Sequence, residues 1–101
     1  MAELSVIAWR DLPAQVVAKG GRVTAKAVLS DRFQEAIDMA ATRAGLTGTD
    51  EYLAEWRRTT RPCGDDLEAE ARAEADRLES MFPPEVLDRI VRAGGLAEEN
   101  G

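Results

Sequence analysis

One thiol and three guanidinium groups lie close together in this sequence and carry most of its potential chemistry. Arg57, Arg58 and Arg61 come shortly before Cys63, and a helix is predicted to begin just after it. Neighbouring cations and a helix N-terminus lower the pKa of a thiol, whereas the two aspartates that follow Cys63 raise it. The chain has no histidine to act as a base for this thiol. A cysteine hydrolase is therefore disfavoured, and we interpret Cys63 as a loop thiol without a role.

The three arginines form the densest basic group of the sequence. Guanidinium groups bind phosphate and carboxylate oxygens through paired hydrogen bonds. Arg57, Arg58 and Arg61 are therefore candidate contacts for a phosphate or for the acidic surface of a partner. A simpler interpretation leaves them in solvent near the end of a helix, where cations interact favourably with the helix dipole, or pairs them with the acidic helix that follows.

A second basic group belongs to a predicted hairpin. Arg22, Thr24 and Lys26 alternate along one strand and so share one of its faces. Arg10 and Lys19 join them only if the register of the strands allows it. The simpler interpretation of this group is a sheet face in contact with solvent.

Composition limits the other kinds of site. The 101 residues include no histidine and one cysteine, which excludes an internal disulfide, most hydrolase triads and most zinc sites. The segment 65–79 places carboxylates one helical turn apart, but it lacks a calcium-type loop, and we interpret it as a solvated helix face. We therefore expect no enzyme activity, no catalytic residue, no metal site and no cofactor.

Charge is distributed unevenly along the chain. The net charge is −6; residues 1–63 carry 9 basic and 8 acidic side chains, and residues 64–101 carry 4 basic and 11 acidic ones. The acidic second half disfavours polyanions as general partners, while the first half has room for a local basic patch. No apolar run approaches the ~20 residues that span a bilayer, and no signal peptide is recognisable. We expect a cytoplasmic protein with no membrane association.

Apolar periodicity predicts the elements that position these residues. Alternating apolar residues indicate strands at 4–10, 15–19 and 23–29, and Gly20 and Gly21 suit a tight hairpin between the last two. Apolar positions repeating at three and four residues indicate helices at 31–45, 49–59, 65–82 and 84–93. The predicted fold class is α+β, as one domain over residues 1–93. It has a small antiparallel sheet of about three strands within 4–29, four helices on one face, and a flexible tail over 94–101.

The order strand, helix, Gly-Leu-Thr turn and helix over residues 22–58 resembles a ribbon–helix–helix DNA-binding protein. In that family two protomers pair their strands into a ribbon that enters the major groove. The resemblance implies a dimeric transcriptional regulator with nucleic-acid contacts from Arg22, Thr24 and Lys26. Val28 departs from the pattern because it offers no hydrogen bond to a base, and Asp50 would repel a phosphate.

A longer resemblance covers residues 7 to about 68. The segments Ile-Ala-Trp-Arg-Asp-Leu-Pro-Ala-Gln-Val at 7–16, Leu-Ser-Asp-Arg-Phe-Gln-Glu-Ala-Ile-Asp at 29–38 and Tyr-Leu-Ala-Glu-Trp-Arg-Arg at 52–58 resemble a bacterial "virulence factor" family of small, mainly alphaproteobacterial proteins. The family label records a phenotype and names no molecular activity. The resemblance implies a bacterial protein without established catalytic residues, acting as an accessory or scaffold subunit.

Two functional hypotheses follow. The first is a non-catalytic interaction module or accessory subunit whose partner is another protein or a second copy of the chain; the predicted helices at 65–82 and 84–93 have apolar faces that a partner could cover. The second is the ribbon–helix–helix regulator, the one hypothesis under which nucleic acid is a partner. A strand 23–29 paired within its own chain, as Gly20 and Gly21 predict, favours the first.

Overall fold

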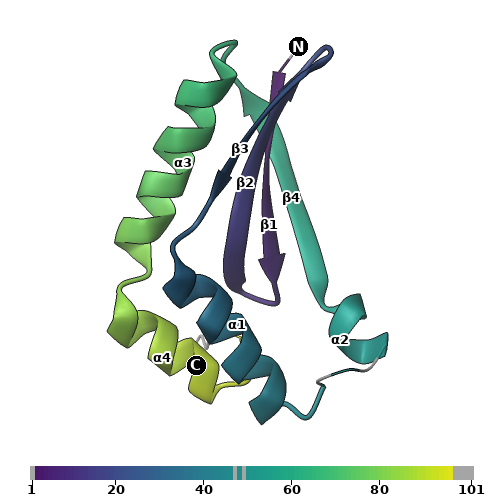
Figure 1. Ribbon diagram of the computed structural model, residues 1–101, viewed down its shortest axis with the longest axis vertical. Coiled ribbons are helices and arrows are strands. Elements are labelled where there is room, and N and C mark those ends of the chain that lie inside the picture. The colour runs from purple at the N-terminus through teal and green to yellow at the C-terminus, as the bar shows by residue number, and fades with distance from the viewer. Residues whose placement is uncertain (1, 47, 49, 97–101) are drawn as a thin grey trace.

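Four strands and four helices make up the part of the chain that the computed structural model describes, residues 2–46, 48 and 50–96 (Figure 1). In chain order they are β1 (Ala2–Trp9), β2 (Leu12–Gly20), β3 (Val23–Val28), α1 (Asp31–Arg43), α2 (Asp50–Ala54), β4 (Trp56–Cys63), α3 (Leu67–Met81) and α4 (Pro84–Arg92). The α+β fold class is confirmed. The sheet has four strands where the sequence predicted about three.

The sheet is antiparallel throughout, in the order β3-β2-β1-β4. Two-residue turns join β1 to β2 and β2 to β3, since Trp9 pairs with Leu12 and Gly20 pairs with Val23. The second turn contains Gly21 with φ 59°, a left-handed conformation that glycine adopts without steric cost. The predicted hairpin at Gly20 and Gly21 is therefore confirmed.

The helix predicted at 49–59 is wrong over its second half. It ends after five residues at Ala54, and the chain continues as β4, which pairs with the whole of β1 from Trp9↔Trp56 to Ala2↔Cys63. Because β4 is an edge strand with six exposed residues, it has no apolar alternation by which a sequence pattern could identify it. Its backbone hydrogen bonds to β1 are available to almost any side chain.

Strand β2 also begins earlier than predicted, at Leu12, and includes Pro13. Pro13 lies opposite Ala8 of β1, next to an irregularity in the register. On its other side β3 has already ended, since the last residue of β3 pairs with Gln15. A proline without an N–H is tolerated where no second strand needs that donor.

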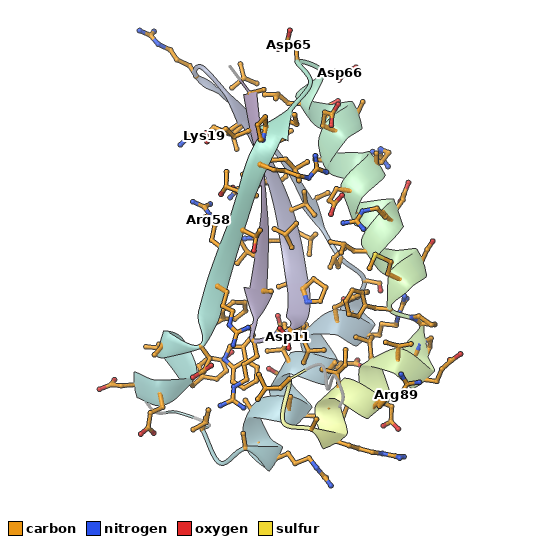
Figure 2. All side chains as sticks on the ribbon, turned by 180° about the vertical axis from the view of Figure 1, so that it is seen from behind. Asp11, Lys19, Arg58, Asp65, Asp66 and Arg89 are labelled. Atoms are coloured by element: carbon orange, nitrogen blue, oxygen red, sulfur yellow. The ribbon has the colours of Figure 1, made fainter. Side chains whose placement is uncertain are left out.

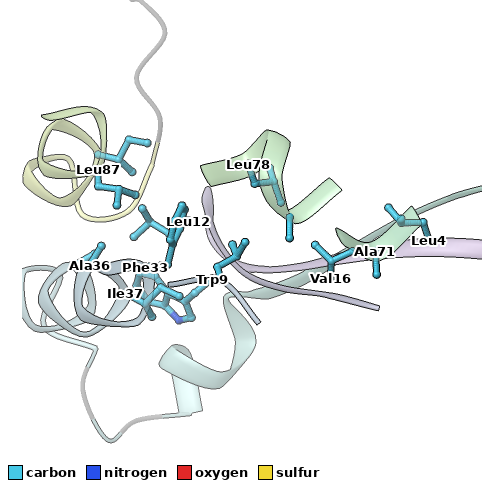
Figure 3. Close-up of a cluster of buried hydrophobic side chains, with 14 of the residues drawn as sticks. Leu4, Trp9, Leu12, Val16, Phe33, Ala36, Ile37, Ala71, Leu78 and Leu87 are labelled. Carbon is cyan, nitrogen blue, oxygen red and sulfur yellow. The ribbon is translucent and has the colours of Figure 1, made fainter. Parts of the chain in front are cut away.

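The helices occupy one face and one end of the sheet (Figures 1 and 3). Helix α3 lies along the face formed by β2, β3 and β1, with Ala71 and Leu78 buried near Leu4 and Val16. Helices α1 and α4 pack on each other at the end where Trp9 and Leu12 are buried; the cluster there includes Phe33, Ala36, Ile37 and Leu87. Along the other face of the sheet, none of the described residues forms a helix. None of the helices in the described part of the chain is both long and apolar enough to cross a bilayer.

The predicted tail begins at residue 94, and its first two residues contact the rest of the chain. The N–H of Asp11 donates to the carbonyl oxygen of Gly95 at 2.8 Å, and Arg10 donates from Nη1 to the carbonyl oxygen of Gly94 at 2.9 Å. Gly95 is buried against the Trp9 ring. These contacts attach the segment after α4 to the β1–β2 turn. The rest of the predicted tail, residues 97–101, lies outside the described residues.

Candidate functional site

The three arginines predicted as one site lie on β4 and point to two sides of the sheet. Because side chains alternate along a strand, Arg57 and Arg61 share the side of α3 and Arg58 faces the opposite side. Arg61 forms an ion pair with Glu74 of α3 at 3.1 Å, and Arg57 forms one with Asp11 at 3.2 Å. The structure therefore separates the predicted group, and two of its members are engaged within the chain.

Glu74 shows why Arg61 is held in this way. Its side chain is only 4% exposed, yet it carries a charge. Arg77, one turn along α3, donates from Nε to its Oε1 at 2.9 Å, and Arg61 donates from Nη2 to the same oxygen at 3.1 Å. The hydrogen bonds from Arg77 lower the pKa of the Glu74 carboxyl, burial opposes them, and Arg61 adds to the lowering. This triad is a structural link between α3 and β4.

The side of the sheet away from α3 is uncovered, and we call it the open face. Strand register places its side chains in three rows across the strands in the order β3, β2, β1, β4: Thr24–Lys19–Glu3–Pro62, Lys26–Val17–Ser5–Thr60 and Val28–Gln15–Ile7–Arg58. Figure 2 shows Lys19 and Arg58 projecting on the side opposite α3. The predicted face shared by Thr24 and Lys26 belongs to this surface.

The open face is basic in an acidic molecule. Its charged side chains are Lys19, Lys26 and Arg58 against a single Glu3, and all four are exposed. None of the three cations forms an ion pair with another residue of the described ranges. Helix α3, on the other side of the sheet, carries five carboxylates and two arginines, so α3 and the open face have opposite charge. Such a division of charge orients a molecule towards a charged partner.

The open face also has apolar area. Val28 is 77% exposed, Ile7 and Trp56 are half-buried, and these three side chains line a shallow hollow with Gln15. Next to it the hydroxyl groups of Ser5 and Thr60 lie 2.9 Å apart and satisfy each other across β1 and β4. The open face thus has apolar contact area at the end near Trp56, with Arg58 beside it and Lys26 and Lys19 farther along the sheet.

The residues assigned to nucleic-acid contact are partly brought together. Thr24 and Lys26 lie on the open face, whereas Arg22 lies in the turn before β3. Arg10 is elsewhere, stacked 5.1 Å from the Trp9 ring centroid and paired with Glu55. Strand β3 already pairs with β2 of its own chain along one edge. The second helix of the resemblance, α2, is short and is followed by the strand β4. Both features differ from a ribbon–helix–helix protomer. DNA binding by β3 stays a prediction.

Cys63 ends β4 and is half-buried beside the core. Partial burial raises the pKa of its thiol, the Glu70 carboxylate raises it further, and Arg61 opposes both. The thiol is thus less ionised than an ordinary cysteine, the reverse of what an activated nucleophile requires. Across residues 2–46, 48 and 50–96, no three Cys, Asp or Glu side chains gather closely enough to hold a metal ion.

Sequence reasoning missed that Arg58 joins Lys19 and Lys26. The signal was the pair Thr59 and Thr60, since β-branched residues next to an arginine pair favour a strand over the end of a helix. With β4 recognised, alternation alone would have separated Arg58 from Arg57. The pairing of β4 with β1 is what brings Arg58 to the surface that β2 and β3 form.

Comparison with known proteins relates the chain to one described family. The model of the family described as Virulence factor matches residues 7–91, so the match begins within β1, ends within α4 and includes every element between them in full. No curated protein and no solved structure matches the chain. The family label describes a phenotype and assigns no chemistry to any residue of the open face. On the extent of this match, the chain belongs to the Virulence factor family.

Proposed function

We propose that this chain is a non-catalytic protein-binding subunit, and that its open face docks the acidic surface of another protein. The observation that carries the proposal is a sheet face that no described helix covers, on which Lys19, Lys26 and Arg58 have no ion-pair partner among the described residues and share the face with exposed apolar area. Apolar area next to charged and polar side chains is the usual composition of a protein interface, in which a desolvated core adjoins a polar rim.

A nucleic acid is the competing polyanion. Single-stranded nucleic acid is bound by aromatic side chains that stack on bases, and Trp56, half-buried at one end, is the one aromatic residue on the open face. The acidic α3 would also repel a long polyanion that extended past the sheet. A compact acidic protein can contact the open face without lying near α3 and so avoids this repulsion. The arrangement therefore favours a protein over a nucleic acid as the partner.

Trp56 provides a direct reporter of docking. It lies at the hollow of the open face, whereas Trp9 is 0% exposed. We expect a 20-residue amphipathic peptide rich in Glu and Leu to change the tryptophan emission on binding. The affinity of the protein for this peptide should fall as the salt concentration rises. The Trp56→Phe variant should abolish the signal, since the remaining tryptophan is shielded from solvent.

Charge-reversal variants test the surface itself. Lys26→Glu with Arg58→Glu should weaken peptide binding about tenfold or more, because like charges then face each other. The matched control is Arg72→Glu with Arg89→Glu, which makes the same change in net charge at exposed positions of α3 and α4 and should bind as the wild type does. Equal losses in both variants, or no binding by the wild type, would overturn the proposal. Tighter open-face binding of a 20-base-pair DNA duplex than of the peptide would overturn it in favour of the nucleic-acid hypothesis.

A further inference from the structure

Strand β3 forms one edge of the sheet, and its backbone is available to another strand. In the described part of the chain the sheet ends at β3, with β2 as its single neighbour. Residues of an antiparallel strand direct their backbone groups alternately to one neighbour and to the other. The N–H of Leu29 donates to Ala14 at 3.3 Å, so Thr24, Lys26 and Val28 direct their N–H and C=O groups away from β2.

A groove runs along this edge between β3 and α3. It has a volume of about 490 Å³ and is lined on one side by β3 from Thr24 to Val28 and on the other by Glu68, Arg72 and Asp76. A second hollow of about 460 Å³ shares Thr24 and Glu68 with it and extends it along the same edge. The side chains of Thr24, Lys26 and Val28 point to the open face, so the β3 wall of the groove is the backbone edge.

Small residues leave this groove open, and its length suits a strand. Ala25 and Ala27 of β3 face Ala71 and Ala75 of α3 across it. The six residues of β3 extend about 20 Å at ~3.3 Å each, and the fifteen residues of α3 extend about 22 Å at ~1.5 Å each, so the helix flanks the whole edge. A groove between an edge strand and a parallel helix is the geometry in which an extended peptide adds to a sheet.

The acidic side chains of the groove favour a basic segment as its occupant. Glu68 and Asp76 line its helix wall against one Arg72, Glu79 of the same wall is paired with Arg32, and Asp65 and Asp66 lie at the end of the groove. Glu68 and Asp76 have no ion-pair partner among the described residues. Alternate side chains of an added strand would point at this wall. We propose that an extended segment of a partner protein, with Lys or Arg at every second position, adds to β3 as a fifth strand in this groove.

A second copy of the chain fits the same edge less well. Antiparallel pairing of two β3 strands would bring two acidic α3 helices side by side on one face. It would also place Lys26 near its own copy on the other face, and like charges on neighbouring strands destabilise a sheet. A basic segment from another protein would instead place cations next to the carboxylates of α3, where the two charges attract. The proposal rests on the proposed function only in that the chain binds proteins, and it concerns a different surface.

Backbone hydrogen exchange tests the added strand directly. The probe is a capped nine-residue peptide in which Lys alternates with Val and Thr. We expect the N–H groups of Thr24, Lys26 and Val28 to exchange rapidly in the free protein and at least tenfold more slowly with the peptide, because an added strand accepts from them. The N–H groups of Ala25 and Ala27, bonded to β2, serve as internal controls and should be slow in both states. Binding without this protection would overturn the proposal.

Two variants test separately how backbone hydrogen bonds and groove charges contribute to peptide binding. Val28→Pro removes a donor that β2 does not use, so it should weaken peptide binding about tenfold while Val28→Thr binds normally. Should Val28→Pro fail to fold, the double variant Glu68→Lys with Asp76→Lys tests the charge of the groove. It should bind the basic peptide about tenfold less tightly than the wild type does. It should bind a peptide with Glu in place of Lys more tightly than the wild type does. Asp50→Lys with Glu51→Lys on α2 is the matched control and should leave both affinities unchanged.

The outcomes are distinct from those of the open-face proposal. Lys19→Glu with Arg58→Glu, which reverses two charges of the open face on β2 and β4, should retain the basic peptide, since neither residue lies on β3. Protection of Thr24, Lys26 and Val28 that grows with protein concentration in the absence of peptide would identify a second copy as the occupant and overturn the proposal. Equal protection of the N–H groups of Thr24, Lys26 and Val28 by the Lys and Glu peptides in the wild type would overturn the charge assignment and the proposal with it, because this protection reports the groove and not the open face.

Discussion

Arg61 of β4 and Glu74 of α3 form an ion pair at 3.1 Å on the side of the sheet that α3 covers. Arg77 donates hydrogen bonds to both oxygens of the same carboxylate. One of the arginines that the sequence assigned to a partner therefore ties the edge strand β4 to the helix of the opposite layer. The open face keeps Arg58, and the difference between these two arginines, three residues apart, follows from the alternation of a strand.

Replacing Arg61 and Arg58 separately should show this division of roles. Arg61→Ala leaves the buried Glu74 with one cation, and we expect a loss of about 1–2 kcal/mol in the free energy of unfolding, below the ~3–5 kcal/mol of a fully buried pair because both arginines are half-exposed. Arg58→Ala removes no ion pair of the described structure and should change stability by less than about 0.5 kcal/mol. Urea unfolding measures both, and an equal loss in the two variants would contradict the assignment.

Acid should remove the contribution of Glu74. The pKa of this carboxyl is lowered in the fold from its ordinary value of 4.5, chiefly by the hydrogen bonds from Arg77. The unfolded chain therefore binds the proton more readily, so the stabilisation is complete above pH 4.5 and declines as the pH falls from there through the lowered pKa. Glu74→Gln should be less stable than the wild type at neutral pH and should lose less stability on acidification.

The exposed Ser80 on α3, which carries no charge, provides the control for that experiment. Ser80→Ala should reproduce the wild-type dependence of the unfolding free energy on pH. A Glu74→Gln curve parallel to the wild-type curve below pH 4.5 would show that the carboxylate is not held by its arginines.

The sequence predicts those elements whose burial follows a period, and it misses β4 for a physical reason. Helices α1, α3 and α4 have apolar stripes because one side of each is buried, and the β2–β3 hairpin has a turn with its own glycine signature. Strand β4 buries almost nothing and is held by its backbone. The candidate site needed β4, since Arg58 reaches Lys19 and Lys26 only through the register with β1.

The charge of the groove could not be read from the sequence for a different reason. The carboxylates of 65–79 were recognised as one face of a helix. That this helix runs beside the free edge of β3 depends on tertiary packing, which no local pattern records. Glu68, Asp76 and Glu79 of this segment thus line one wall of a groove when α3 packs against β3, whereas Glu74 is buried between two arginines.

Cys63 should react slowly with alkylating reagents. Partial burial and Glu70 raise the pKa of its thiol, so less thiolate is present at pH 8 than in the unfolded chain. The rate of reaction with iodoacetamide should therefore be lower in the native protein than in urea. Cys63→Ser should leave the urea midpoint and the binding of the acidic peptide unchanged. A native rate above the rate in urea would identify an activated thiol and reverse this interpretation.

The contact between Gly95 and Trp9 should make residue 95 sensitive to a single methyl group. Gly95 has φ 95°, and a Cβ built there would lie 2.7 Å from Cζ3 of the fully buried Trp9 ring. Gly45, after α1, has a similar φ of 73° and nothing within 4 Å of such a Cβ. The two positions share the backbone strain of a left-handed alanine and differ in the steric clash.

Gly45→Ala should therefore lose only the conformational term, about 1 kcal/mol in the free energy of unfolding. Gly95→Ala should lose about 3 kcal/mol or more, because the ring must shift or the segment that bonds Asp11 must detach. Near-ultraviolet circular dichroism distinguishes these two responses, since a displaced Trp9 alters the aromatic signal. Equal losses in the two variants, with an unchanged aromatic spectrum, would mean that Gly95 does not pack on Trp9 and that the chain after α4 is not fixed to the β1–β2 turn.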